Sequence, residues 1–253
     1  MKQYIQNFKK FQPLLEELVA RDIKIKYRRS VLGVLWTLLN PLLMMIVLSV
    51  VFSNLFKFDV ENFPLFILSG QVIFNFFSES TTNAMGAILG NASLIRKIYV
   101  PKYLFVISRI FSSFINLMAS FTALILVMVA TRAELHWTVI LVPIPLVLLV
   151  IFSMGIGLIL SAIAVKFRDI MHLYSVFITA LMYLTPIIYP AWLKPIVNLN
   201  PITNILLMFR DVMLDYTIFD AKSIIIAVIE AGLALVIGLR VFYKAQDEFI
   251  LNI

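Results

Sequence analysis

The sequence predicts an all-α membrane protein, as its composition, the length of its apolar stretches and its charge distribution all indicate. Of the 253 residues, 62% are hydrophobic and only 14% are charged. Soluble domains contain about 45–50% apolar and about 25% charged residues. The apolar stretches are continuous, as in membrane helices, and lack the alternation that is typical of a membrane β-barrel.

We expect six transmembrane helices, because a helix needs about 20 apolar residues to cross a bilayer. The expected ranges are 33–56, 65–89, 104–130, 139–165, 171–189 and 222–243. Six spans place both termini on one side of the membrane. Of the 21 Lys and Arg residues, 16 fall on that side and 5 on the other. The positive-inside rule therefore predicts cytoplasmic termini. The basic excess reflects topology, and we expect no nucleic-acid partner.

The first 31 residues are expected to form a cytoplasmic domain, followed by a transmembrane domain over 32–253. Phe8, Phe11, Leu15 and Leu18 recur at helical spacing among charged residues. Such a helix lies in the membrane interface, with its apolar side in the acyl boundary. A helix packed on a soluble partner is the alternative.

A second segment that we do not expect to span the membrane covers residues 190–221. Its helical pattern carries Arg210, Asp211 and Asp215, and each charge costs about 2.5–3.5 kcal/mol at the centre of a span. We therefore predict one or two short re-entrant helices in the outer leaflet. A surface amphipathic helix is the alternative.

Several enzyme classes lack their motifs in this sequence. It contains no Cys, no phosphate-binding G-x-x-x-x-G-K-[ST] loop, and only two histidines, His136 and His172, which we expect on opposite sides of the membrane. We expect neither a catalytic site nor a metal or other cofactor in this chain. Glu79 and Glu230 fall within spans without a basic partner in the same span. We favour a polar lock within the bundle or near a wet pore, and an ion-coupled carrier remains an alternative.

Small residues predict close helix packing at two places. Gly86 and Gly90 form G-x-x-x-G at the end of the second stretch, and Gly155 and Gly157 lie in the fourth. Glycine lets helix backbones approach closely in membranes.

The loop of residues 91–103 is more apolar than a plain cytoplasmic turn requires. Leu94, Ile95, Ile98 and Tyr99 recur at helical spacing and predict a short helix with one apolar side. The same loop holds three cations and no acid. A partner protein or an anionic lipid surface would both suit this composition.

Three parts of the sequence belong together. They are R-D-I-K-I-K-Y-R-R-S-V-L-G-V-L-W-T-L-L-N-P-L from Arg21, L-I-R-K-I-Y-V-P-K-Y from Leu94, and V-K-F-R-D-I from Val165, the last followed by L-T-P-I-I-Y-P from Leu184. In this order they resemble the membrane subunits of type-2 ABC exporters, above all those for O-antigen, capsule-like polysaccharide or teichoic acid. The resemblance covers nearly the whole chain. It implies a half-transporter that pairs with a second copy and with two ATPase subunits, which carry the ATP and Mg²⁺.

The resemblance also implies residue roles. The loop 91–103 would be a coupling helix, and the residues expected to contact the ATPase are Leu94, Ile95, Arg96, Lys97, Ile98, Tyr99, Lys166, Arg168 and Asp169. A lipid headgroup would meet the basic cluster of Arg21, Lys24, Lys26, Arg28 and Arg29, although topological anchoring also explains it. The aromatic side chains expected to line a channel are Trp36, Phe74, Phe77, Tyr183 and Tyr189, with lipid contact as the alternative.

The expected function is ATP-driven export of a lipid-linked polysaccharide from the cytoplasmic side of the bacterial inner membrane. Export of a small lipid or drug by the same architecture is the alternative. The transported sugar and its lipid carrier are not encoded in any motif that we recognise.

Overall fold

The computed structural model describes residues 2–28, 32, 33, 35–55, 62–97, 100–190, 197 and 200–249. These residues form helices and no strand, so the all-α prediction is confirmed for them. The elements are α1 (Lys2–Tyr27), α2 (Leu35–Leu55), α3 (Phe63–Met85), α4 (Ala87–Gly90), α5 (Ala92–Ile95), α6 (Tyr103–Thr131), the 3-10 helix η1 (Trp137–Leu141), α7 (Pro143–Lys166), α8 (Ile170–Leu184), α9 (Pro201–Met213), α10 (Ala221–Ala245) and the 3-10 helix η4 (Gln246–Glu248).

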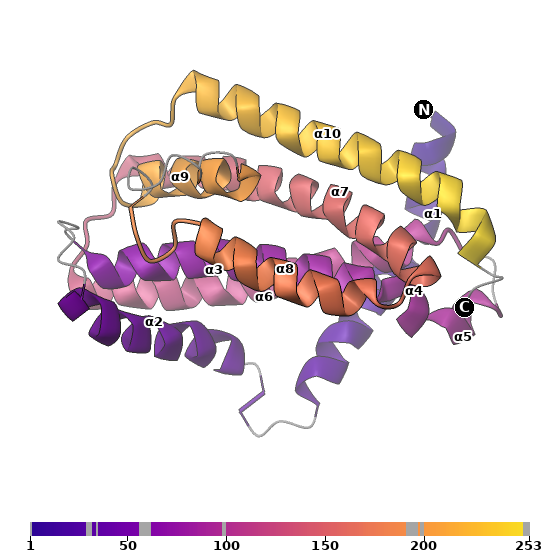
Figure 1. Cartoon of the computed structure of the whole chain (residues 1–253), viewed down its shortest axis with the longest axis horizontal. Coiled ribbons are helices and arrows are strands. Elements are labelled where there is room, and N and C mark those ends of the chain that lie inside the picture. The colour runs from indigo at the N-terminus through magenta and orange to yellow at the C-terminus, as the bar shows by residue number, and fades with distance from the viewer. Residues whose placement is uncertain are drawn as a thin grey trace.

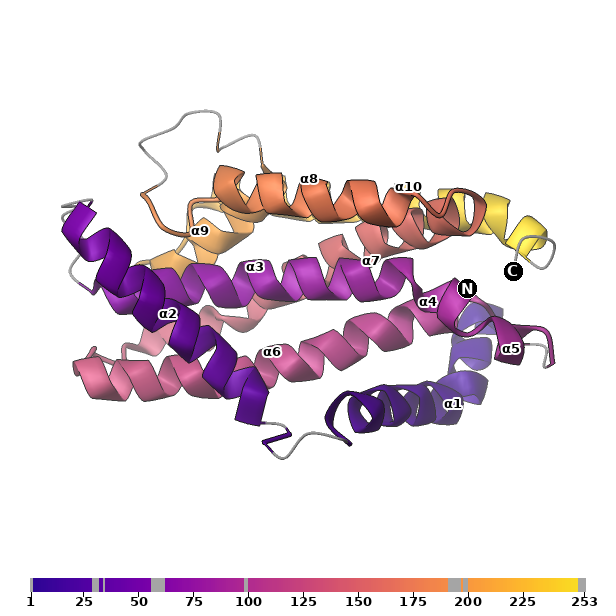
Figure 2. The ribbon, with the colours of Figure 1, turned by 60° about the horizontal axis from the view of Figure 1, so that its bottom comes forward.

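The long helices form an elongated bundle (Figures 1 and 2). Helix α3 packs on α6 and α7, α10 runs along α7, and α2 crosses α3 and α6. One end of the bundle holds the start of α1, the short helices α4 and α5, and the last turns of α10. Helix α9 lies towards the opposite end. Arg96 and Lys97, which directly follow α5, therefore lie at the first of these two ends.

Four helical stretches in the described part of the chain are long and apolar enough to cross a membrane: Leu35–Phe52, Tyr103–Thr131, Trp137–Lys166 and Ala221–Glu248. Helix α8 is apolar but has only 15 residues. It ends at Leu184, whereas the sequence predicted helix to 189. Pro186 explains the difference, because a proline disfavours the helical conformation of the residue before it, and Thr185 is extended.

Helix α3 begins where the Asn62 side chain accepts a hydrogen bond from the Leu65 amide at 3.2 Å. It stops at Met85, and α4 continues after Gly86 as a separate turn. The predicted helix over 65–89 is therefore broken. A Cβ added at Gly86 or Gly90 would meet nothing closer than 3.9 Å. The G-x-x-x-G pattern marks this break and not a close helix contact, so that interpretation was wrong.

The other small-residue prediction is confirmed at Gly155, where α7 crosses α10. A Cβ at Gly155 would lie 2.3 Å from the carbonyl carbon of Ala234, and one at Gly238 would lie 2.4 Å from the Gly155 oxygen. These contacts involve backbone atoms, so only glycine fits at both positions.

Helix α9 packs inside the bundle against α3, α7 and α10, and most of its residues are buried. This placement does not fit the alternative of a surface amphipathic helix. The buried Arg210 donates hydrogen bonds to Ser69 Oγ and to the carbonyls of Phe66, Pro186 and Ile187. Burial lowers the pKa of Arg210 to about 9, against the opposing charge of Asp215, so the guanidinium remains charged at neutral pH. It fixes α9 to α3 and to the segment that follows α8.

Candidate functional site

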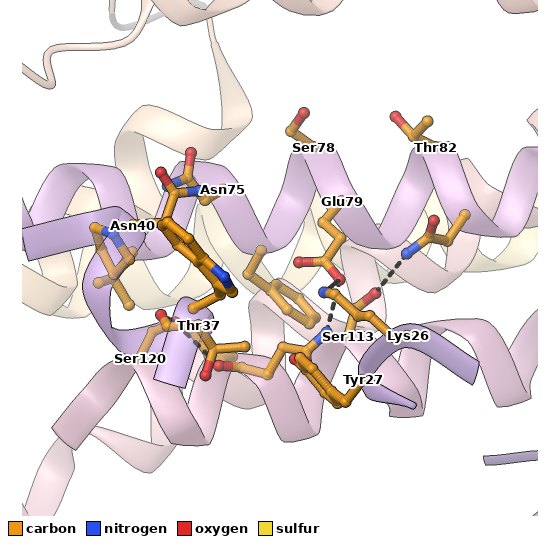
Figure 3. A pocket seen from close by; sticks show the side chains of 17 residues that line it. Lys26, Tyr27, Thr37, Asn40, Asn75, Ser78, Glu79, Thr82, Ser113 and Ser120 are labelled. Carbon is orange, nitrogen blue, oxygen red and sulfur yellow. Dashed lines mark hydrogen bonds and ion pairs between the residues drawn. The ribbon is translucent and has the colours of Figure 1, made fainter. Parts of the chain in front are cut away.

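A cleft of about 660 Å³ lies between α1, α2, α3 and α6 (Figure 3). Its lining is rich in amide and hydroxyl side chains, unlike the lipid-facing sides of the same helices. The lining residues are Lys26, Tyr27, Trp36, Thr37, Asn40, Pro41, Val72, Asn75, Phe76, Ser78, Glu79, Thr82, Asn83, Ser113, Asn116, Leu117 and Ser120. The cleft is thus a polar space beside α2 and α6, two helices that are otherwise apolar enough to cross a membrane.

Glu79 of α3 lies at the centre of this lining. Its Oε1 accepts hydrogen bonds from Lys26 Nζ at 2.8 Å and from Asn116 Nδ2 at 2.7 Å. Tyr27 in turn donates to Asn116 Oδ1 at 2.8 Å. Burial raises the pKa of Tyr27, so its phenol remains a donor at neutral pH. Three side chains, two from α1 and one from α6, therefore hold this carboxylate of α3 in place.

The basic partner of Glu79, Lys26, comes from α1 and not from a transmembrane stretch. An isolated charge within a span is costly, and the ion pair with Lys26 reduces that cost. The lock within the bundle that the sequence predicted for Glu79 is confirmed. Glu230 of α10 is different, because its Oε2 is buried without a hydrogen-bond partner among the described residues.

A second polar cluster connects α1 to α5 and α6, beside a smaller space of about 360 Å³. The Asp22 carboxylate accepts from Arg21 at 3.1 Å and from Arg109 at 3.3 Å. Arg21 also donates to Asn91 Oδ1 at 2.8 Å, at the start of α5. Asp22 is buried, so this cluster fastens α1 to the rest of the bundle.

These contacts divide the predicted headgroup cluster. Arg21 and Lys26 are paired with acids within the chain. Lys24 and Arg28 have exposed side chains, and Arg29 lies outside the described residues. The structure does not gather the four cations that it describes, Arg21, Lys24, Lys26 and Arg28, into one anion-binding pocket.

The predicted coupling helix is much shorter than the loop that contains it. Helix α5 has four residues, Ala92–Ile95, and Ile98 and Tyr99 lie outside the described residues. Ile95 is buried in the protein's own core and Leu94 packs against it. Arg96 and Lys97 are exposed. The apolar side of this turn is thus partly occupied inside the chain, which the helical spacing alone did not predict.

The second predicted contact, Lys166, Arg168 and Asp169, is exposed between α7 and α8. Lys166 Nζ pairs with Glu248 Oε2 at 2.5 Å. Lys102, after the α5 loop, donates to the Gln246 carbonyl. The short helix η4 thereby connects both expected contact regions.

The predicted channel aromatics fall into two groups. Phe74 and Phe77 are only 3% and 2% exposed, and Phe77 stacks on Phe152 at 5.7 Å between ring centroids. Burial removes both rings from the surface of this chain, because their side of α3 faces the core. Trp36 is 48% exposed and lines the cleft. Tyr183 is exposed on α8, and Tyr189 donates to its carbonyl at 2.8 Å.

The sequence contained a signal for the cleft that the aromatic pattern obscured. Asn75, Ser78, Glu79, Thr82 and Asn83 recur every three or four residues and so form a polar stripe along α3. Nothing comparable indicated that Asn116 of α6 would face this stripe. Among the described residues, no group of His, Asp and Glu side chains could hold a metal ion.

Comparison with known proteins gives matches over most of the chain. A sequence model of the family described as ABC-2 type transporter matches residues 13–214. The chain is 28% identical over 245 residues to the O-antigen export system permease protein RfbA of Klebsiella pneumoniae, covering 93% of both chains. It is 27% identical to RfbA of Myxococcus xanthus and 24% identical to the polysialic acid transport protein KpsM of Escherichia coli, covering 94% of this chain and 95% of the relative in each case.

Proposed function

The chain belongs to the ABC-2 type transporter family, and we propose that it is the membrane subunit of an ATP-driven exporter of a lipid-linked polysaccharide. The observation that carries this proposal is similarity over nearly the whole chain to permeases named for O-antigen and polysialic acid transport. The polar cleft supports it, because a hydroxyl-rich cargo needs polar partners inside the membrane.

The proposed topology has six spans, with both termini in the cytoplasm of a bacterial cell and the chain in the inner membrane. Four of the spans are the stretches long and apolar enough to cross, and α3 and α8 are the others. The polar stripe along α3 accounts for its lower apolarity, and α8 is apolar but short, with 15 residues. Helix α9 is then a re-entrant element at the outer side.

The proposed assembly contains a second copy of this chain and two ATPase subunits that bind ATP and Mg²⁺. The ATPase would contact the exposed Arg96 and Lys97 after α5, and Arg168 and Asp169 between α7 and α8. The first two residues directly follow α5, and the other two lie in the connection between α7 and α8. Charged groups at the rim of an interface govern association and partner choice more than affinity.

A lipid headgroup would reach the inner side near Lys24 of α1 and Arg28, which directly follows α1, because both side chains are exposed. Arginine can hold a phosphate through two parallel hydrogen bonds. Arg21 and Lys26 are less available, since each is paired with a carboxylate. Entry between α2 and α8 would require the second copy, because α2 packs on α3 and α6 in this chain.

Deleting the gene for this chain, and then supplying the gene again on a plasmid, tests the function. We expect loss of the glycan from the cell surface and accumulation of its lipid-linked form inside. We also expect an ATPase to co-purify with the tagged chain from membranes. Replacing exposed Lys97 by Glu should weaken this association, whereas the same change at Lys222, on α10, should not. Surface glycan that is unaffected by deletion would refute the proposal.

A further inference from the structure

We propose that the cleft between α1, α2, α3 and α6 binds a short stretch of neutral sugar residues, with Glu79 accepting hydrogen bonds from sugar hydroxyls. The inference rests on the proposed function, since it takes the cargo to be a glycan. The proposal places a sugar-binding site within a single copy of the chain. It also gives Glu79 a role in addition to linking α1, α3 and α6.

The volume and lining of the cleft suit such a ligand. Ligand pockets commonly have volumes of about 300–1,000 Å³, and this cleft has about 660 Å³. Asn40 of α2 and Asn75 of α3 are exposed beside it, and an amide offers both donors and acceptors. Sugar hydroxyls likewise donate and accept. Amides on a membrane-spanning bundle would otherwise face lipid at a cost.

Glu79 is positioned to receive hydroxyl donors. Lys26 and Asn116 both donate to its Oε1, and among the described residues no hydrogen bond to Oε2 is recorded. An ionised carboxylate has about four acceptor positions on its two oxygens. Figure 3 shows the second oxygen directed towards the side of the cleft where Asn40 and Thr37 lie. The ion pair therefore orients the carboxylate and leaves acceptor positions towards the space.

Trp36 supplies the apolar part of the site. Its indole is 48% exposed and lines the same cleft. One face of a sugar ring consists of C–H groups and packs on a flat aromatic ring, while the indole N–H can donate to a hydroxyl. Amides, a carboxylate and an aromatic ring at one space together match a neutral carbohydrate.

The charge of the cleft excludes two other ligand classes. Lys26 and Glu79 are the charged residues of its lining, and they neutralise each other. A pyrophosphate would meet a carboxylate and no unpaired cation from the lining. A lipid tail would cover the amides without offering them hydrogen bonds. The glycan, and not its lipid anchor, is therefore the part of the cargo that this space fits.

Site-specific photo-crosslinking in exporting cells tests the proposal, with the full chain and its ATPase present. A benzophenone amino acid replaces Asn40 or Asn75 in separate strains, and Val47 in the control strain. Val47 is exposed two turns beyond Asn40 on the same helix but does not line the cleft. Co-purification of the ATPase shows that each variant is assembled.

After irradiation, we expect the chain to carry a glycan ladder from positions 40 and 75, at least fivefold above position 47. Glu79→Gln should reduce this yield at least threefold, and Glu230→Gln should leave it unchanged, since Glu230 lies outside the cleft. Phospholipid adducts alone from positions 40 and 75, or equal glycan yields at position 47, would overturn the proposal. The positional comparison keeps Glu79 and does not depend on whether its variant folds.

Failure of the cleft and failure of the proposed function give different results. If surface glycan depends on the chain but no glycan adduct forms at positions 40 and 75, the cleft is not the sugar site while export stands. If surface glycan is the same with and without the chain, the export function itself is refuted.

Discussion

Replacing Gly155 by alanine tests how closely α7 packs on α10. The new Cβ would lie 2.3 Å from the carbonyl carbon and 2.4 Å from the oxygen of Ala234. Carbon atoms in favourable contact are about 3.5–4.0 Å apart. The atoms that clash belong to a helix backbone and cannot rotate away, so the two helices must separate by about 1 Å.

The cost follows from this separation. Overpacking a core costs about 1–3 kcal/mol, and a gap of about 0.5–1 Å removes a quarter to a half of each neighbouring dispersion contact. We therefore expect the upper end, about 3 kcal/mol. Alanine is favoured over glycine within a helix by about 1 kcal/mol, which offsets part of it. The net loss of stability should be about 2 kcal/mol.

Thermal unfolding of the purified chain in detergent measures this loss, and Gly232→Ala in α10 is the matched control. A Cβ at Gly232 would meet nothing within 4 Å, so only the helix preference acts there and the melting temperature should stay or rise. Gly155→Ala should melt several degrees lower. Equal melting temperatures for the two variants would show that α7 and α10 do not pack as described.

Three further predictions concern charged groups. Arg210→Lys keeps the charge, but a lysine cannot reach all four acceptors of the guanidinium, so we expect the free energy of unfolding to fall by about 2 kcal/mol. Limited proteolysis of the segment after α8 should become faster. Unchanged proteolysis would contradict the role of Arg210. Burial, with the charge of Asp215, raises the pKa of Asp211 to about 6. The stability that this raised pKa contributes is therefore present below about pH 4 and is lost as the pH rises through about 6. Asp211→Asn should remove that dependence and stabilise the chain at pH 7 by about 1 kcal/mol, allowing for partial exposure; melting curves from pH 4 to 7.5 that keep the slope would refute this. Asp22→Asn should weaken the attachment of α1 to the bundle, because Arg21 and Arg109 lose the carboxylate that they share. Limited proteolysis should therefore cut α1 faster in this variant than in the control Glu17→Gln, because the Glu17 carboxylate is exposed.

The helices and their order could be predicted because continuous apolar stretches leave few alternatives in a membrane protein. Their ends were less predictable where a local feature competes with the pattern. Pro186 ends α8 early, and Gly86 separates α3 from α4. The helical spacing after Asn91 suggested a longer helix than the single turn α5, because spacing reports which residues could share a face and not how many turns form.

The cleft was harder to predict because its contacts join distant parts of the chain. Lys26 and Glu79 are 53 residues apart, and Asn116 lies a further 37 residues along. Each residue alone is compatible with topological anchoring or bundle packing. Their meeting depends on how α1 and α6 pack beside α3, and no residue in a single stretch specifies that arrangement.

On α3, the type of a residue did not predict whether it faces the cleft or the core. Phe74 and Phe77 suggested a track of rings because aromatic side chains suit a sugar, yet both face the core, where large apolar groups are stabilised most by burial. Asn75 lies one residue from Phe74, about 100° around the helix, and reaches the cleft. In this bundle the polar stripe, and not the aromatic content, marks the side of α3 that faces open space.

Helix α1 connects the two regions for which function is proposed. Arg21 contacts Asn91 at the start of α5, and Lys26 contacts Glu79 in the cleft. The two residues are five positions apart on one helix, about 7.5 Å along its axis. A continuous helix does not stretch over that distance, so a displacement of α5 relative to α3 must break one of the two contacts or move α1. The basic segment that the sequence suggested as a headgroup site therefore connects the α5 turn to the cleft through Arg21 and Lys26. Its exposed cations, Lys24 and Arg28, are the ones available for the proposed headgroup contact.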